Sequence, residues 1–254
     1  MLQQERFQII LDDLARESAV TVRDLANKMS VSESTIRRDI SALDDAGKVN
    51  KVFGGAVSAE QGTTRTIISK ERSIAEKQVL NIEEKTSVAK YAAALVEDDD
   101  FVFIDAGTTT ALLIENLTNK HATYITNGIR HALRLAERGF TVYMLSGQAK
   151  SLTEAITGAL ACESMKKYDF TKSFIGVNGI DPEKGFTTPD IEESLVKSEA
   201  VRRSMQAYIL SDNSKFGVVS SVTFADIGKA AIITNACCDE RVKKATQVIE
   251  TKMS

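Results

Sequence analysis

The stretch "VSESTIRRDI" (residues 31–40) combines a helix start with a two-sided distribution of side chains. Ser32 is placed to cap a helix N-terminus. Apolar residues then recur at i, i+4 and i+7 and share one face: Ile36, Ile40 and Leu43. At about 100° per residue, the opposite face carries polar residues: Ser34, Arg38, Ser41 and Asp45, with Thr35 and Arg37 on the flanks. One face can therefore pack on a protein core while the other meets a polar partner.

Further helices and a hairpin are predicted around this stretch. Two amphipathic helices precede it, over residues 4–16 and over a segment with Val22, Leu25, Ala26 and Met29 at helical spacing. After Gly47, "KVNKVFGGAV" (residues 48–57) alternates apolar and polar residues and turns at Gly54-Gly55, which predicts a β-hairpin. Together these elements predict a winged helix-turn-helix domain, whose third helix enters the major groove of DNA.

The polar face of the third helix suits nucleic acid. Small hydroxyls can approach base edges or the backbone, and arginine can reach guanine or phosphate. The candidate DNA contacts in the helix and hairpin are Ser32, Ser34, Thr35, Arg37, Arg38, Ser41, Lys48 and Lys51.

The charge of this domain is close to neutral. Residues 1–57 hold eight Lys and Arg against nine Asp and Glu, and the whole chain has a net charge of -3. Ordinary helices with solvated arginines therefore remain an alternative, because a near-neutral domain gains little nonspecific attraction from phosphates. DNA affinity would have to come from a local cationic edge and from subunits paired on repeated half-sites. We therefore expect a homo-oligomer, either a dimer or a tetramer.

Length and composition predict a cytoplasmic protein of two domains. The chain has 254 residues, 43% of them hydrophobic, which is enough for a sizeable core. It has no run of about 18 apolar residues of the kind that spans a membrane. The three cysteines, Cys162, Cys237 and Cys238, fit neither a disulfide framework nor a zinc cluster. We expect reduced structural thiols, no metal and no cofactor.

The larger part of the chain predicts an open α/β fold with a parallel sheet. Six short apolar runs alternate with helical patterns: "FVFIDAG" (101–107), "ATYITNG" (122–128), "FTVYMLSG" (140–147), "KSFIGVNG" (172–179), "QAYILSD" (206–212) and "AAIITN" (230–235). Runs that are apolar at successive positions are typical of strands covered on both faces. The small polar stretch "SAEQGTTRT" (58–66) indicates a linker. We predict a winged domain over residues 1–57, a linker over 58–68 and an α/β domain over 69–254, which begins with a helix from 69 to 96.

Several glycine-containing turns follow these predicted strands. "IDAGTTT" (104–110) places Gly107 and three threonines where a strand passes into a helix, and N–H groups at a helix start favour an anion such as phosphate. Alone this signal is weak, because ordinary turns and caps use the same residues. "ITNG" (125–128), "LSGQ" (145–148) and "GVNGID" (176–181) strengthen it, since open α/β sheets bind ligands outside the carboxyl ends of their strands.

Three stretches carry a resemblance to a known family. "ERFQIILDDL" (5–14), "VRDLANKMSVSESTIRRDISALDDAGKV" (22–49) and "VFGGAV" (52–57) resemble the N-terminal signature of the DeoR family of bacterial transcriptional regulators, whose winged head binds operator DNA. The C-terminal part of that family resembles the sugar-phosphate isomerase fold. The resemblance implies that Gly107, Thr108, Thr109 and Thr110 hold the phosphate of a sugar phosphate. Asp105, at the start of the same loop, is a further candidate ligand-binding residue. The resemblance also places Asn127, Gly128, Asn178 and Gly179 near the sugar, and Lys215 of "SDNSKFG" (211–217) at the same pocket.

Catalysis is not expected. An isomerase of this fold would need a carboxylate base at the sugar carbon, and the isomerase relatives have an acidic loop after the fourth strand, where this chain reads Val177-Asn178-Gly179. Asp181 lies close by in sequence. We predict no catalytic residues, and surface or cap roles for His121 and His131. For Glu192 and Glu193, in "GFTTPDIEE" (185–193), a favourable place in a first helical turn is preferred to ligand contact.

The resemblance implies a repressor of a sugar-utilisation operon that a phosphorylated sugar releases from its operator. Among family members, the fructose-utilisation repressors are nearest in general pattern, which makes fructose 1-phosphate the first candidate effector. Two alternatives stay open: an enzyme similar to a sugar-phosphate isomerase, and a transcriptional activator with the same DNA-binding head.

Overall fold

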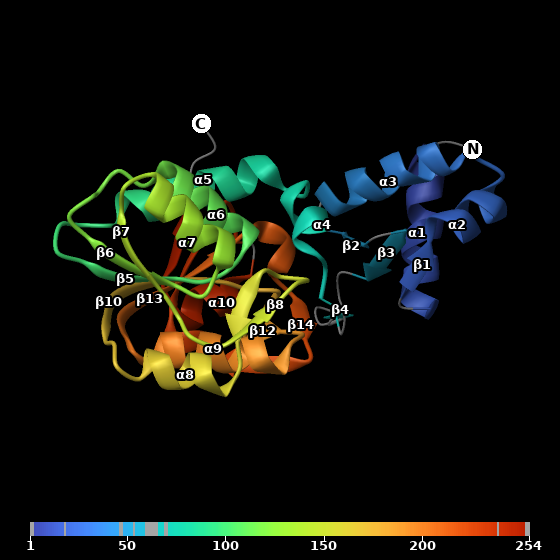
Figure 1. The fold of residues 1–254 in the computed structure, drawn as a ribbon. Coiled ribbons are helices and arrows are strands. Elements are labelled where there is room, and N and C mark those ends of the chain that lie inside the picture. The colour runs from blue at the N-terminus through green and yellow to red at the C-terminus, as the bar shows by residue number, and fades with distance from the viewer. Residues whose placement is uncertain are drawn as a thin grey trace. The chain divides into compact units, whose positions relative to one another are not determined.

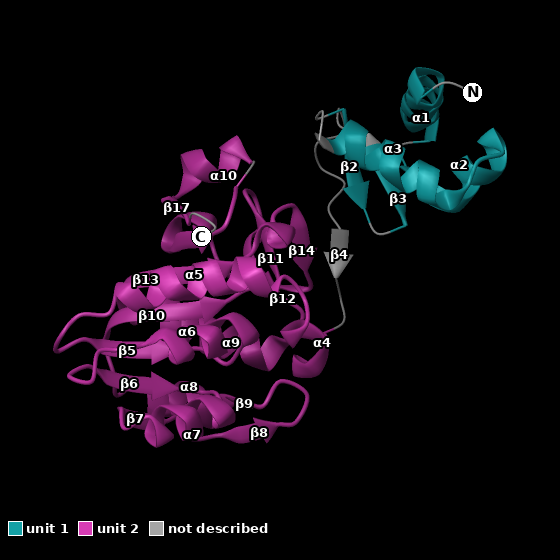
Figure 2. Ribbon diagram, turned by 90° about the horizontal axis from the view of Figure 1, so that it is seen from above, with its two compact units in different colours: residues 1–64 teal, residues 65–254 magenta. Residues whose placement is uncertain are grey.

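The computed structural model describes residues 3–17, 19–45, 48–52, 54–58, 66–68, 71–237 and 239–251. The chain divides into two compact units, residues 1–64 and residues 65–254 (Figure 2). Of the predicted linker, residues 59–65 lie outside the described residues, as does Cys238. No helix in the described ranges is long and apolar enough to cross a membrane.

The N-terminal unit is a three-helix domain with a small antiparallel sheet. Its elements are α1 (Gln3–Glu17), β1 (Ala19–Thr21), α2 (Val22–Met29), α3 (Glu33–Asp45), β2 (Val49–Val52) and β3 (Gly55–Ser58). The predicted apolar face of α3 is buried against residues of α1 and α2 in one cluster. The predicted hairpin is confirmed as β2 paired with β3.

One strand of this unit has no signal in the sequence. β1 pairs with β3 and widens the hairpin to a sheet in the order β1-β3-β2. Three residues are too few to show periodicity, so the pattern could not predict it. Gly55 permits the pairing, because a Cβ at that position would lie 1.9 Å from the Val20 carbonyl oxygen.

A seven-stranded sheet forms the centre of the C-terminal unit (Figure 1). Its strands pair in parallel in the order β17-β16-β13-β10-β5-β6-β7. In chain order they are β5 (Phe101–Ile104), β6 (Thr123–Thr126), β7 (Thr141–Met144), β10 (Phe170–Gly176), β13 (Ser204–Ser211), β16 (Ala231–Thr234) and β17 (Val248–Glu250). The six predicted strands are confirmed, and β17 is an addition. β5, β6, β10 and β16 are buried at successive positions because both of their faces are covered, whereas the edge strand β7 is largely exposed.

Two hydrophobic cores lie on the two faces of this sheet. One core takes residues from α5 (Ile82–Ala94), α6 (Thr108–Asn116) and α7 (Ile129–Glu137). The other takes residues from α8 (Ala159–Met165), α9 (Ile191–Arg202) and α10 (Glu240–Ala245). Figure 1 shows α5, α6 and α7 on one side of the strands and α8 and α9 on the other. The unit is thus a three-layer α/β fold, as predicted.

The remaining elements are short and connect the strands and helices of this unit. They are β4 (Thr66–Ile68), α4 (Ile74–Gln78), β8 (Gln148–Lys150), β9 (Ala155–Thr157), β11 (Gly179–Asp181), β12 (Gly185–Thr188), η1 (Asn213–Lys215), β14 (Val218–Ser220), β15 (Val222–Ala225) and η2 (Ile227–Lys229). β4, which is part of the predicted linker, pairs in parallel with β14.

The predicted helix over residues 69–96 is wrong in its continuity. Residues 69 and 70 lie outside the described residues, residues 71–73 are not helical, and the helical part forms α4 and α5 with a break between them. Asn81 adopts a left-handed conformation at φ 52°, and its side-chain Nδ2 donates to Asp212 Oδ1 at 2.9 Å. This tertiary hydrogen bond stabilises the left-handed conformation that separates the two helices. The helical periodicity of the sequence could not predict it.

The order of the strands reverses between β5 and β10. The chain builds outward from β5 through β6 to β7, and then outward from β10 through β13 and β16 to β17. Open α/β sheets bind ligands at such a reversal, outside the carboxyl ends of the strands. The fold therefore directs the search for a site to the loops after β5, β10 and β13.

Candidate functional site

The outer face of α3 presents the polar residues predicted to contact DNA. The Ser32 hydroxyl lies 2.8 Å from that of Ser34 and 2.9 Å from that of Thr35, and it accepts the Thr35 N–H, so it caps the helix. Arg37 forms an ion pair with Glu33 at 2.7 Å, whereas Arg38 is exposed and has no ion-pair partner in the described part of the chain. Arg38 can therefore bind DNA without first breaking an ion pair, whereas Arg37 would have to leave Glu33.

Contacts from α1 and from the hairpin hold α3 in place. Arg6 of α1 donates to the buried Asp39 carboxylate through Nε at 2.5 Å and through its terminal nitrogen at 3.0 Å. Lys51 of β2 donates from Nζ to the Ser41 hydroxyl at 2.8 Å. Lys48 is exposed. The predicted DNA contacts thus lie on α3 and on the hairpin beside it, and their binding to DNA remains a prediction.

A small cavity lies where the strand order reverses, at the carboxyl ends of β5, β10 and β13. We call it the anion recess, with a volume of about 70 Å³. Its lining comes from four parts of the unit: residues 106–110; residues 176–178; residues 210–212 with Lys215; and Ile74, Lys77, Lys85, Thr153, Glu193 and Lys197.

The first turn of α6 supplies hydrogen-bond donors to the recess. Its N-cap residue is Gly107, and no side chain caps the helix there. The first N–H groups of a helix have no partner within the helix and carry partial positive charge. The loop after β5 therefore offers backbone donors to an anion.

Two lysines in the recess lack carboxylate partners at ion-pair distance among the described residues. Lys85, only 6% exposed, donates from Nζ to the Lys77 carbonyl at 2.6 Å. Burial lowers the pKa of Lys85 and of Lys215, and the charge of Asp212 opposes the shift in both. Asp212 is itself held by Asn81 Nδ2 and by the Ser214 N–H. Two partly desolvated ammonium groups facing one recess are stabilised by an anion placed between them.

Lys197 and two carboxylates form a second group at the back of the recess. Lys197 is buried in an ion pair with Asp105 and donates to the Gly176 carbonyl at 3.1 Å. Burial opposes the charged form of Lys197, but Asp105 and Glu193 outweigh burial, so its pKa is raised. Burial raises the pKa of Glu193, although Lys197 and a 2.6 Å hydrogen bond from Thr153 oppose the shift. Glu193 lies in the first turn of α9, as predicted, and its side chain is in addition buried and lines the recess, which the sequence did not predict.

Six of the residues predicted to bind ligand line the recess: Gly107, Thr108, Thr109, Thr110, Asn178 and Lys215. The other four lie behind it. Asp105 is committed to Lys197 and to the Gly176 N–H, and Asn127 Oδ1 accepts the Ala106 N–H at 2.8 Å. A Cβ on Gly128 would lie 2.7 Å from the His131 ring, and one on Gly179 would lie 2.3 Å from the Val218 carbonyl oxygen. Asp105, Asn127, Gly128 and Gly179 thus shape the loops.

Asp181 is also away from the recess. Its carboxylate accepts the N–H groups of Glu183 and Lys184, both at 2.9 Å, in the turn between β11 and β12. It is therefore no replacement for the catalytic carboxylate that the loop after β10 lacks.

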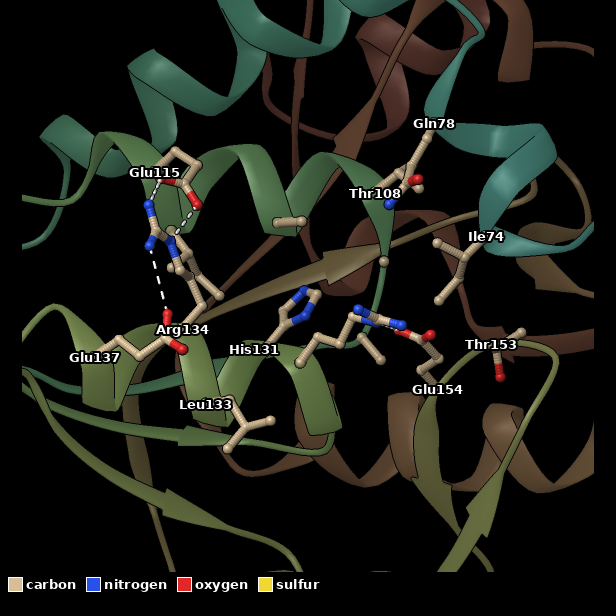
Figure 3. A pocket seen from close by; sticks show the side chains of 15 residues that line it. Ile74, Gln78, Thr108, Glu115, His131, Leu133, Arg134, Glu137, Thr153 and Glu154 are labelled. Carbon is tan, nitrogen blue, oxygen red and sulfur yellow. Dashed lines mark hydrogen bonds and ion pairs between the residues drawn. The ribbon is translucent and has the colours of Figure 1, made fainter.

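A larger cavity of about 340 Å³ lies between α6 and α7 (Figure 3). It shares Ile74, Thr153 and residues 106–108 with the anion recess. Its charged side chains are paired with one another: Arg134 bonds Glu115 at 2.7 and 2.8 Å, and Arg130 bonds Glu154 at 2.5 Å. Because these guanidiniums already have carboxylate partners, the cavity lacks the uncompensated positive charge of the recess.

His131 lies on the wall between the two cavities, and the predicted surface or cap role for it was wrong. The ring is buried, with Nε2 3.0 Å from the Thr110 hydroxyl, and Thr110 donates its own proton to the Gly107 carbonyl at 2.9 Å. Nε2 must therefore carry the proton of the neutral ring and donate it to Thr110. His121, in contrast, is exposed.

Acid is expected to destabilise the C-terminal unit through His131. Burial lowers its pKa from 6.5 to about 4, against the opposing charge of Asp105. Since the folded pKa is depressed, the unfolded chain takes up a proton first as the pH falls from 6.5 to 4. The free energy of unfolding should drop by about 3 kcal/mol across that range. Urea titrations of the parent and of His131→Gln, which keeps a donor for Thr110, would test this. An equal drop in both would exclude His131 as the cause.

The cysteines offer no metal site in the part that the structure describes, where no group of three or more His, Cys, Asp or Glu is arranged to hold an ion. Cys162 and Cys237 are free thiols, half-buried and buried respectively.

Comparisons with known proteins agree with this arrangement of units. Residues 6–62 match the model of the DeoR-like helix-turn-helix domain, and residues 80–236 match that of the DeoR C terminal sensor domain. An uncharacterized HTH-type transcriptional regulator, FruR of Bacillus subtilis, is 40% identical over 235 residues, covering 92% of this chain and 91% of that protein. The lactose phosphotransferase system repressor of Streptococcus mutans is 29% identical over 254 residues, covering 98% and 99%.

Similarity to solved structures is weaker. Ribose 5-phosphate isomerase A of Methanocaldococcus jannaschii is 18% identical with a TM-score of 0.39, over 54% of this chain and 55% of that one. The two family models and the relatives together show that the chain belongs to the DeoR family of transcriptional regulators.

Proposed function

We propose that the protein is a repressor that binds operator DNA as a homo-oligomer and leaves it when a phosphorylated sugar occupies the anion recess. The observation that carries the effector half of this proposal is the pair Lys85 and Lys215. Both ammonium groups face the recess without carboxylate partners at ion-pair distance among the described residues. A phosphate monoester is a dianion with several acceptor oxygens, so it can satisfy both lysines and the α6 donors together.

The sugar is proposed to lie toward the loop after β10. Asn178, Thr153 and Glu193 line that side of the recess and offer amide, hydroxyl and carboxyl groups for sugar hydroxyls. Asn178 Oδ1 also accepts the Thr188 hydroxyl at 3.1 Å, which fixes the orientation of its amide. Fructose 1-phosphate is the first effector to test, as the resemblance to fructose-utilisation repressors implies.

The DNA half of the proposal rests on α3 and its hairpin. Arg38 and Ser34 are exposed on the outer face of α3, and Lys48 and Lys51 lie on the hairpin side. Because the domain is near neutral, specific contacts and paired half-sites must supply most of the affinity. A ligand can release such a repressor only by binding more tightly to the form that does not fit the operator.

The proposal predicts release by a phosphosugar alone. DNA from the region upstream of the protein's own gene should bind at fixed salt, and fructose 1-phosphate should weaken the complex while free fructose does not. Fluorescence anisotropy of labelled DNA measures both effects. Tight binding that no phosphosugar changes would remove the effector from the proposal. An absence of DNA binding would remove the repressor.

An isomerase-like activity is the second candidate, and Glu193 is the observation that favours it. A buried carboxyl with a raised pKa beside a sugar site suits a general base or acid. Against it, the relatives with matching length are named as regulators or repressors. Interconversion of the aldose and ketose phosphates, followed by NMR, would establish the activity if Glu193→Gln abolished it.

A further inference from the structure

Glu71 brings a carboxylate of the chain itself to the anion recess. Both of its oxygens lie 3.2 Å from Asn178 Nδ2, which donates to them, and Lys77 forms an ion pair with it. Asn178 and Lys77 both line the recess. The Glu71 side chain is 8% exposed, so this carboxylate is almost fully withdrawn from water.

The charge of Glu71 reaches the same groups that a ligand would meet. It contributes to raising the pKa of Lys197 and of Glu193, and it opposes the burial that lowers the pKa of Lys215. Without ligand, Glu71 therefore supplies part of the negative charge that the recess requires. It satisfies the Asn178 amide as well, which the proposed sugar would need.

The Glu71 carboxylate opposes the entry of a second anion beside it. Like charges a few ångströms apart in a poorly solvated site repel strongly, and each needs the same donors. A phosphosugar that takes Asn178 and adds two negative charges would leave Glu71 without one partner and beside a repelling neighbour. Rotation of Glu71 away from Asn178 would relieve both effects.

Glu71 lies in the part of the C-terminal unit that comes first in the sequence, so a displacement of its side chain affects the chain just before α4. Glu71 follows β4 and precedes α4, the first helix of the sensor unit. β4 pairs with β14, which begins three residues after Lys215. The segment that carries Glu71 is thus attached to the recess at Asn178 and Lys77, and beside the Lys215 loop through β4.

We propose that Glu71 is an internal competitor of the effector: its carboxylate holds Asn178 and Lys77 in the ligand-free repressor, and a phosphosugar binds by displacing it. This inference rests on the proposed phosphosugar site and adds its regulation. Displacement detaches residues 71–73 from Asn178, and these residues precede α4 on the side of the chain that leads to the DNA-binding unit in sequence. The competition also sets the ligand concentration at which release begins, since each tenfold in affinity corresponds to about 1.4 kcal/mol.

The test compares Glu71→Gln with the parent, using the full chain and fructose 1-phosphate in isothermal titration calorimetry. The amide is isosteric but uncharged, so the variant should bind the phosphosugar about tenfold more tightly. Loss of an ordinary binding or packing residue would weaken binding, so the direction of the change distinguishes the roles. Glu71→Asp keeps the charge and should stay nearer the parent. Glu83→Gln removes an exposed carboxylate of α5 and should bind like the parent.

Each outcome bears on one of the two proposals. Unchanged affinity in Glu71→Gln would overturn the competitor role and leave the phosphosugar site intact. Weaker binding by a variant with the parent's thermal unfolding midpoint would also overturn it, because Glu71 would then be a ligand contact. If the parent bound neither fructose 1-phosphate nor a panel of other hexose and pentose phosphates, the proposed function and this inference would both fall.

Discussion

A Lys85→Met, Lys215→Met double variant is expected to bind operator DNA like the parent and to need at least about 100-fold more phosphosugar for release. Each lysine is proposed to make a charge-assisted hydrogen bond to the phosphate, worth about 1.5–3 kcal/mol. Two such bonds amount to about 3–6 kcal/mol, or more than a hundredfold in affinity. Anisotropy of labelled operator, titrated with fructose 1-phosphate, measures both the binding and the release.

The matched control is Lys90→Met, Lys229→Met, which removes two exposed lysines from the same unit. It should keep the parent's release curve. The test variant should also unfold at a temperature no lower than the parent, because methionine removes two ammonium groups that burial disfavours. A double variant with an unaltered release curve would place the phosphate elsewhere and refute the assignment of the recess.

Arg38→Ala is expected to weaken operator binding by about 5- to 150-fold for each half-site, which corresponds to the range of about 1–3 kcal/mol for an arginine contact to a base edge. Arg37→Ala should cost less, because Arg37 is already in an ion pair with Glu33. Both substitutions remove one positive charge from neighbouring positions on the same helix. Their comparison at one salt concentration therefore separates a specific contact from general attraction to phosphate.

Phosphosugar binding supplies the internal control for the arginine variants. Both should bind fructose 1-phosphate with the parent's affinity, because α3 belongs to the N-terminal unit and the recess to the C-terminal unit. A larger loss of DNA binding in Arg37→Ala than in Arg38→Ala would mean that the face of α3 turned to DNA is not the one assigned here.

Periodicity predicts most of the fold because burial imposes it. The apolar stripe of α3 and the unbroken apolar runs of the central strands are direct consequences of one-sided and two-sided covering. β1 could not be predicted, because three residues are too few to show a strand periodicity. The break between α4 and α5 could not be predicted either, because Asn81 is held by Asp212, a residue distant in sequence.

Two kinds of sequence signal point to residues of the candidate site. The loop after β5 and Asn178 follow strand ends, whereas Lys85 and Lys197 could have been found by their places on buried helix faces. Each lysine occupies a position of its helix that is otherwise buried and apolar: Lys85 lies one turn before Val88 and Ala89, and Lys197 one turn before Ala200. A lysine on an apolar stripe must be paired or functional once buried. The sequence around Glu71 has no comparable signal, since its side chain is buried only by tertiary contacts.

Hydrogen bonds within the loop after β5 determine which of its donors and acceptors remain available to a ligand. The Gly107 carbonyl accepts from the Thr110 hydroxyl at 2.9 Å and from the Ala111 N–H at 3.0 Å, so both of its lone pairs are committed. His131 in turn occupies the Thr110 oxygen. The Gly107 carbonyl therefore has no lone pair left for a ligand in the recess, although it lies at the start of α6 beside the helix N–H groups. An anion that approaches these N–H groups thus avoids the repulsion that a free carbonyl oxygen at the N-cap would cause.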